Sequence, residues 1–118
     1  MNDFPSPQRT DELISIVQSE QLYADLILQL NKDFTYANEP LDFSVEMSPE
    51  ELCKSLHEKI YILITHRFAS YLNLLYIIDV SESQVKKLDG TDVVKLSEQV
   101  LFLILKREWQ KVWFRKRL

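Results

Sequence analysis

The chain has 118 residues, of which 46% are apolar and 27% are charged, and its net charge is −4. This length suits one domain with a core of its own, and the composition excludes a disordered protein. One glycine and four prolines are too few for the many turns of a sheet protein. We therefore expect an all-α fold.

The single cysteine excludes an internal disulfide and is typical of a reducing compartment. The longest purely apolar run, residues 100–105, has six residues, far below the ~18 that a membrane span requires. The first ten residues contain no apolar stretch of the signal-peptide kind. The sequence therefore predicts a cytoplasmic protein without membrane contact.

Residues 1–9 are polar and rich in proline, so we expect a flexible tail ahead of one helical-bundle domain, residues 10–118. Thr10 is the predicted N-cap of a first helix, with Asp11 and Glu12 in its first turn. This helix is predicted to run to about residue 34. Its apolar side chains repeat at heptad-like spacing: Ile16, Tyr23, Ile27, Leu30 and Phe34.

Residues 35–47 alternate apolar and polar side chains, which predicts an extended connector packed over the helices. A second helix follows, because Ser48 can accept the N–H of Glu51 and Pro49 occupies the first helical position. The apolar pattern continues it to about Asp79. Its buried face is predicted to consist of Leu52, Leu56, Ile60, Leu63, Tyr71, Leu74 and Ile78.

Ser81 can cap a short helix over residues 82–88. A turn at Asp89 and Gly90 follows, and Thr91 is the predicted cap of a third long helix that runs nearly to the end. Three long helices with moderate links predict an antiparallel up-down-up bundle, with the short helix as an extra element.

Three charged side chains fall inside otherwise apolar helical stripes: Glu20, Arg67 and Arg107. At about 1.5 Å rise per residue, an antiparallel bundle would bring them to about the same position along the bundle axis. This predicts either an ion network that fixes the register or an anion-binding pocket. If their positions along the bundle axis do not match, all three side chains are simply exposed.

The third long helix carries a second apolar stripe: Phe102, Leu105, Trp109, Val112 and Trp113. Tryptophan is enriched at binding hot spots, so this stripe predicts a contact surface, with Trp109 and Trp113 as anchors. The expected partner is a protein, most simply a second copy in a homodimer. The alternative is that this helix is central, with both stripes covered by the chain's own elements.

Charge is unevenly distributed along the chain. Residues 1–60 carry 12 acidic and 4 basic side chains, whereas residues 61–118 carry 6 acidic and 10 basic ones. The simplest interpretation is that acidic and basic helices pack side by side. The basic residues 106–117 also allow nucleic-acid binding, but the acidic remainder of the chain would repel a phosphate backbone.

The sequence contains no catalytic signature. Cys53 and His57 are spaced i, i+4, but two ligands do not make a structural zinc site, which takes four. We therefore expect no cofactor and no metal, and a non-enzymatic interaction or scaffold module that self-associates through the C-terminal helix. One alternative is a ligand-binding or enzymatic bundle that uses Arg67 and Arg107 as an anion clamp, and a weaker one is nucleic-acid binding through residues 106–117.

Overall fold

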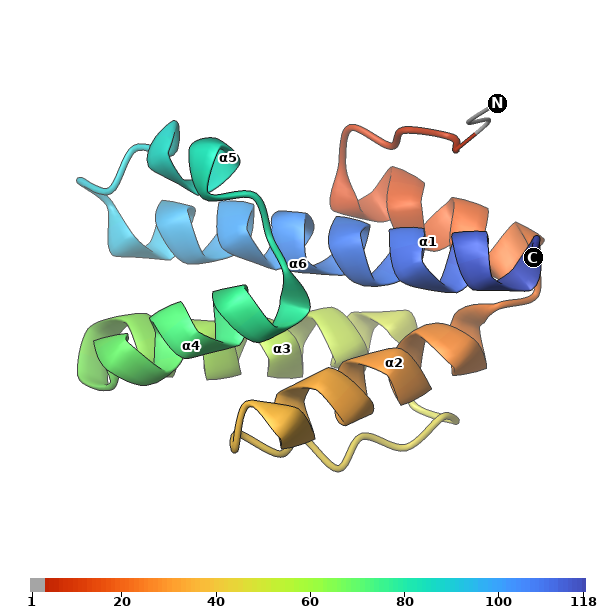
Figure 1. The fold of residues 1–118 in the computed structure, drawn as a ribbon, viewed down its shortest axis with the longest axis horizontal. Helices are drawn as coiled ribbons and strands as arrows, with labels where there is room; N and C mark the ends of the chain where they lie inside the picture. The colour runs from red at the N-terminus through yellow and green to blue at the C-terminus, as the bar shows by residue number, and fades with distance from the viewer. Residues whose placement is uncertain (1–3) are drawn as a thin grey trace.

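The computed structural model describes residues 4–118, which fold into six helices without a strand (Figure 1). The helices are α1 (Thr10–Ser19), α2 (Tyr23–Tyr36), α3 (Pro49–His66), α4 (Phe68–Ile78), α5 (Glu82–Lys86) and α6 (Val93–Lys116). The all-α class is confirmed, and so is the short helix after residue 81. Within the described range, no helix is both long and apolar enough to cross a membrane.

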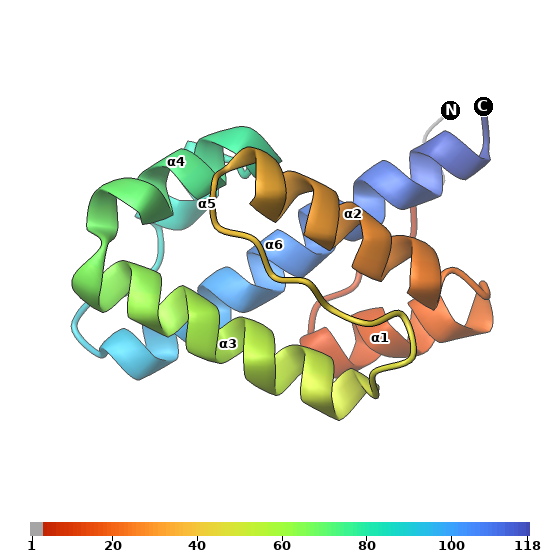
Figure 2. The same cartoon turned by 90° about the horizontal axis from the view of Figure 1, so that it is seen from below.

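The longest helix, α6, is the central element of the fold. It runs through the length of the molecule in Figures 1 and 2 and packs against α1, α2, α3 and α4. Because neighbours surround it, α6 buries side chains on more than one side. They are Ser97, Val100, Leu101, Ile104, Leu105, Glu108, Trp109, Val112 and Trp113.

The predicted first helix is two helices, so the bundle of three long helices is corrected at this point. α1 ends at Ser19, and the Leu22 amide bonds the Val17 carbonyl at 3.1 Å in a tight helix-ending turn. Gln21 has a left-handed φ of 59° in that turn, a conformation usually taken by glycine. No glycine or proline marks the break in the sequence, so the apolar pattern runs across it unchanged.

The predicted second helix is broken as well. α3 and α4 are separated by Arg67 alone, whose φ of −142° and ψ of 63° are not helical. An unbroken helix over residues 49–79 would be about 46 Å long at the usual rise, longer than the 36 Å that the molecule measures along its longest axis. The break lets α4 fold back beside α3 and against α6 (Figure 2).

Two of the predicted caps are confirmed and two are displaced by one residue. Ser48 accepts the Glu51 amide at 3.1 Å and Ser81 accepts the Gln84 amide at 3.4 Å. Thr10 is the first residue of α1, not its cap. Asp92, not Thr91, caps α6 and accepts two backbone amides at 3.0 and 3.2 Å.

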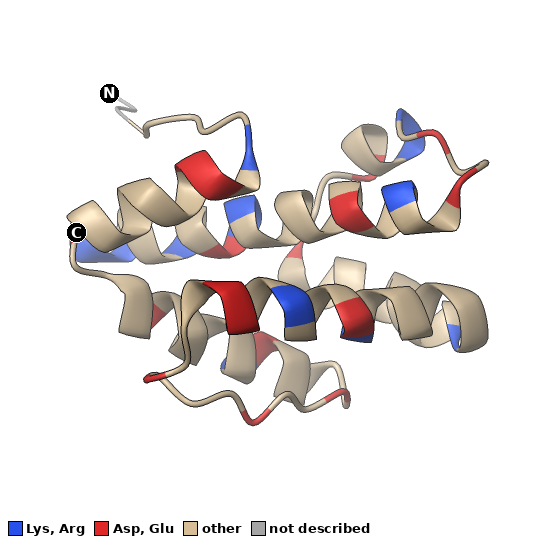
Figure 3. Cartoon of the chain, turned by 180° about the vertical axis from the view of Figure 1, so that it is seen from behind, with Lys and Arg blue, Asp and Glu red and all other residues tan. Residues whose placement is uncertain are grey.

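The connector between α2 and α3 packs over the helices, as its alternating pattern predicts, but it is not extended throughout. Asp42 has a left-handed φ of 55°, and the Met47 amide bonds the Ser44 carbonyl at 3.1 Å in a turn. Leu41, Phe43 and Met47 lie against the core, whereas Val45 is exposed. The Asn31 side chain bonds both the amide and the carbonyl of Phe43, at 3.0 and 2.9 Å. The connector carries acidic residues and no basic ones (Figure 3).

The described N-terminal segment begins at the same end of the molecule as the C-terminus and runs alongside α1 before that helix starts (Figure 1). Phe4 packs edge-on against Trp113, with 5.6 Å between ring centroids. Residues 1–3 of the predicted flexible tail lie outside the described residues, and the flexibility of the tail stays a prediction.

Candidate functional site

The second apolar stripe of α6 is covered by the chain itself. Leu105, Trp109 and Val112 have no exposed surface, and Trp113 is 6% exposed. Phe102 is partly buried against the same core. The prediction that Trp109 and Trp113 anchor an exposed contact surface is therefore wrong. The structure shows the alternative, in which α6 is central and the chain's own elements cover both of its apolar stripes.

Trp113 is enclosed by groups that periodicity alone does not bring together. The rings of Phe4 and Phe114 both pack against the Trp113 ring in a T-shaped arrangement, with 5.6 and 5.0 Å between ring centroids. The Arg117 guanidinium lies 3.8 Å from the ring centroid, at cation–π distance. A tail residue and the basic C-terminus thus cover what the sequence presents as a bare aromatic face.

The predicted charged layer does not form. Glu20 pairs with Arg117 at 2.8 Å, Arg67 with Glu39 at 2.7 Å and Arg107 with Asp79 at 3.1 Å. The prediction that these three residues share one position along the bundle axis assumed unbroken helices. The breaks at Gln21 and Arg67 place them at different positions along it. Arg67 and Arg107 therefore do not form an anion clamp together.

The basic end of α6 instead neutralises the acidic N-terminal helices. Lys111 pairs with Asp33 at 2.7 Å and Lys116 with Asp25 at 3.6 Å, both on α2. Figure 3 shows this basic end beside the first two helices. Since these cations already have acidic partners, residues 106–117 offer fewer free charges to a nucleic acid than the sequence indicates.

A buried acid pair is the main polar feature that sequence reasoning missed. Glu108 on α6 is fully buried and Asp33 on α2 is 6% exposed. Lys111 Nζ lies 2.7 Å from Asp33 Oδ2 and 3.4 Å from Glu108 Oε1. Gln29 donates to the same Asp33 oxygen at 3.2 Å and accepts from Arg115 at 2.7 Å.

The two acids of this pair hold different charges. Burial, then the hydrogen bond and charge of Asp33, raise the pKa of Glu108 to about 9. Burial would raise the pKa of Asp33 too, but hydrogen bonds from Glu108, Lys111 and Gln29 lower it below 3.8. Neither Glu108 oxygen accepts a hydrogen bond from the described residues, and the Lys111 ammonium, 3.4 Å away, bonds Asp33 at 2.7 Å instead. As an acid, Glu108 can donate to Asp33. Because both groups are closed to solvent, we assign them to stability.

Cys53 and His57 show no sign of a reactive or metal centre. His57 Nε2 lies 2.6 Å from Ser97 Oγ, and burial raises the pKa of the Cys53 thiol, which keeps it protonated. Over residues 4–118, no three metal-ligating side chains of the His, Cys, Asp and Glu types come together.

The exposed apolar surface of the molecule includes a stripe on α4. Phe68 is 54% exposed, Leu72 50% and Tyr76 81%. The opposite face of α4 carries Tyr71, Leu74 and Ile78, which are buried, as the sequence predicts. Beside Leu72 and Tyr76 a groove of about 470 Å³ runs to Val85 of α5.

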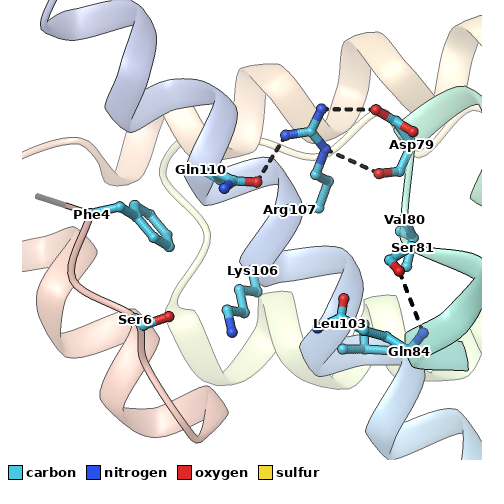
Figure 4. A pocket seen from close by; sticks show the side chains of 10 residues that line it. All are labelled: Phe4, Ser6, Asp79, Val80, Ser81, Gln84, Leu103, Lys106, Arg107 and Gln110. Carbon is cyan, nitrogen blue, oxygen red and sulfur yellow. Dashed lines mark hydrogen bonds and ion pairs between the residues drawn. The ribbon is translucent and has the colours of Figure 1, made fainter. Parts of the chain in front are cut away.

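A more polar cavity of about 580 Å³ lies between the N-terminal segment, the α4–α5 connector and α6 (Figure 4). Its lining includes Ser6, Asp79, Gln84, Lys106, Arg107 and Gln110. The sequence points to Arg107 as a site residue, but it does not identify Lys106 as its neighbour in a cavity.

Comparison with protein-family models, with curated proteins and with solved structures found no match to this chain. Its function is therefore argued from its own geometry.

Proposed function

We propose that this chain is a non-enzymatic protein-interaction module that self-associates through the outer face of α4, most simply as a two-fold dimer. The observation that carries the proposal is the composition of α4. Its eleven residues, Phe-Ala-Ser-Tyr-Leu-Asn-Leu-Leu-Tyr-Ile-Ile, include no charged side chain. A helix without any charged side chain is normally well buried, yet one side of α4 faces solvent.

The exposed side is a regular surface. Phe68, Leu72 and Tyr76 are spaced i, i+4 and i+8, so they form one stripe along the helix axis. All three are at least half exposed. An apolar stripe beside an apolar groove marks a contact surface in a soluble protein, and covering it would remove these side chains from water.

The geometry of the stripe favours a second copy as the occupant. A two-fold dimer contact joins the same patch on both subunits. With two antiparallel α4 helices, Leu72 meets Leu72 near the axis, and Phe68 of each copy lies opposite Tyr76 of the other. The uncharged stripe brings no like charges together in this arrangement.

Charges at the two ends of α4 support the same pairing. Arg67 precedes the helix and its side chain is 49% exposed. Asp79 follows the helix and its side chain is 79% exposed. Both are already paired within the chain, Arg67 with Glu39 and Asp79 with Arg107. In an antiparallel pair the basic end of one copy lies opposite the acidic end of the other, which adds a weak preference for this direction.

The cytoplasm is the proposed compartment. One half-buried cysteine, Cys53, with a thiol whose pKa is raised by burial, suits a chain that needs no oxidising environment. The interaction surface proposed for α4 requires neither a metal nor a cofactor.

Sedimentation equilibrium over a range of concentrations tests this proposal. Wild type should show a concentration-dependent mass that approaches twice the monomer mass, and Leu72→Asp should remain a monomer because it buries a charge at the axis. Val94→Asp is the matched control, since Val94 is 47% exposed in the first turn of α6, where a carboxylate suits the helix dipole. A monomeric wild type at the highest soluble concentration, or equal effects of the two variants, would overturn the proposal.

A further inference from the structure

We infer that the polar cavity between the N-terminal segment, the α4–α5 connector and α6 binds a small organic dianion whose two charged groups are apart, such as a dicarboxylate. This is a ligand site in addition to the α4 contact surface. At about 580 Å³ the cavity has the size of a small-molecule site.

Arg107 provides the first anion-binding group. Its Nε donates to the Asp79 carbonyl at 3.1 Å, its Nη2 to the Asp79 carboxylate at 3.1 Å and its Nη1 to Gln110 Oε1 at 2.8 Å. A guanidinium has five N–H groups, so two remain for a ligand. The three bonds in place hold the guanidinium in one orientation, which is the arrangement that favours recognition of a planar carboxylate.

Lys106 provides the second anion-binding group. Its Nζ lies 5.9 Å from the centroid of the Phe102 ring, and none of the acidic side chains in residues 4–118 forms an ion pair with it. Figure 4 shows Lys106 and Arg107 extending from α6 in opposite directions. A ligand that reaches both must therefore carry its negative groups at separate ends.

The rest of the lining suits a polar ligand. Gln110 uses its Oε1 for Arg107, which leaves its amide N–H groups to donate beside the guanidinium. Ser6 and Gln84 line the cavity from the N-terminal segment and from α5. Asp79 is the one acidic group of the lining, against two cations, so the cavity has an excess of positive charge.

Isothermal titration with three probes tests the inference: succinate, butyrate and inorganic phosphate. Succinate and butyrate have the same carbon chain but two and one carboxylates, and phosphate is a compact anion. We expect succinate to bind at least tenfold more tightly than either of the others. Lys106→Ala should weaken succinate binding at least tenfold and remove its advantage over butyrate, because the second charged end then has no partner.

Lys95→Ala is the matched control, since it removes an exposed lysine from the first turns of the same helix. It should leave succinate binding unchanged. Leu72→Asp should also bind succinate as wild type does, so failure of the dimer proposal and failure of this inference are distinguishable. Absence of succinate binding to wild type, equal affinity for butyrate or phosphate, or unchanged binding in Lys106→Ala would overturn the inference.

Discussion

Glu108 and Asp33 face each other inside the bundle, one from the central helix α6 and one from α2, and both lie within 3.4 Å of the Lys111 ammonium. The pair holds one negative charge. Asp33 keeps that charge because Lys111 and Gln29 bond it, and Glu108 remains protonated because its site is fully buried. This arrangement makes the stability of the fold depend on pH.

The sign of that dependence follows from Glu108. Its pKa is about 9 in the folded protein and near the ordinary 4.5 in the unfolded chain. Between these values the folded state binds more protons than the unfolded state, so the free energy of unfolding falls as pH rises. The loss is roughly 1 kcal/mol for each pH unit in this window.

Glu108→Gln should remove this loss, because glutamine has the shape of the acid, stays neutral and can donate to Asp33. Urea denaturation should show the variant equal to wild type near pH 5 and more stable by about 2–4 kcal/mol at pH 8. Lys116→Gln is a suitable control, since it alters an exposed partner of Asp25. A constant difference between variant and wild type at both pH values would show that Glu108 does not titrate within the window.

Trp109→Ala should lower stability by about 3–5 kcal/mol, the usual cost of deleting a large buried aromatic side chain. Trp109 has no exposed surface, and its indole N–H has no hydrogen-bond partner among the described residues. Trp109→Phe should therefore cost much less than Trp109→Ala. Denaturation midpoints at one fixed protein concentration measure both effects. Loss of assembly in Trp109→Ala at unchanged stability would instead restore α6 as a contact surface.

Two glutamates should differ sharply in their contribution to stability. Glu20 pairs with Arg117 at the surface, with both side chains about 40% exposed, so Glu20→Ala should cost less than about 0.5 kcal/mol. The Glu39 side chain is only 6% exposed and pairs with both Lys59 and Arg67, so Glu39→Ala should cost about 1–3 kcal/mol. Thermal unfolding of the two variants in parallel checks the contrast. Equal losses would mean that burial of Glu39 brings no benefit.

Local signals in the sequence were the most reliable guide to the fold. Ser48 caps α3 and Pro49 is its first residue, as predicted. The seven residues predicted for the inner face of α3 and α4, from Leu52 to Ile78, are all buried. Periodicity identifies which side of a helix faces inward. It does not show that the helix is interrupted, because Gln21 and Arg67 break the chain without glycine or proline.

The candidate sites were less predictable for the same reason. The sequence places Glu108 beside tryptophans on a helix that is apolar on two sides. It does not identify Asp33 as the partner of Glu108, because Asp33 is 75 positions earlier in the chain. Only the path of α2 around α6 brings them together. Likewise, the stripe of α6 looked unpartnered because Phe4 and Arg117, which cover Trp113, come from the two ends of the chain.

Disulfide cross-linking at residue 72 tests the central claim, self-association through α4, most directly. In a Cys53→Ser background, Leu72→Cys places one thiol on each copy at the proposed two-fold axis. Mild oxidation should rapidly yield a covalent dimer with Cys at position 72, and should yield much less with Val94→Cys, which is exposed to a similar degree. Equal or slower cross-linking of Leu72→Cys relative to Val94→Cys would contradict the account.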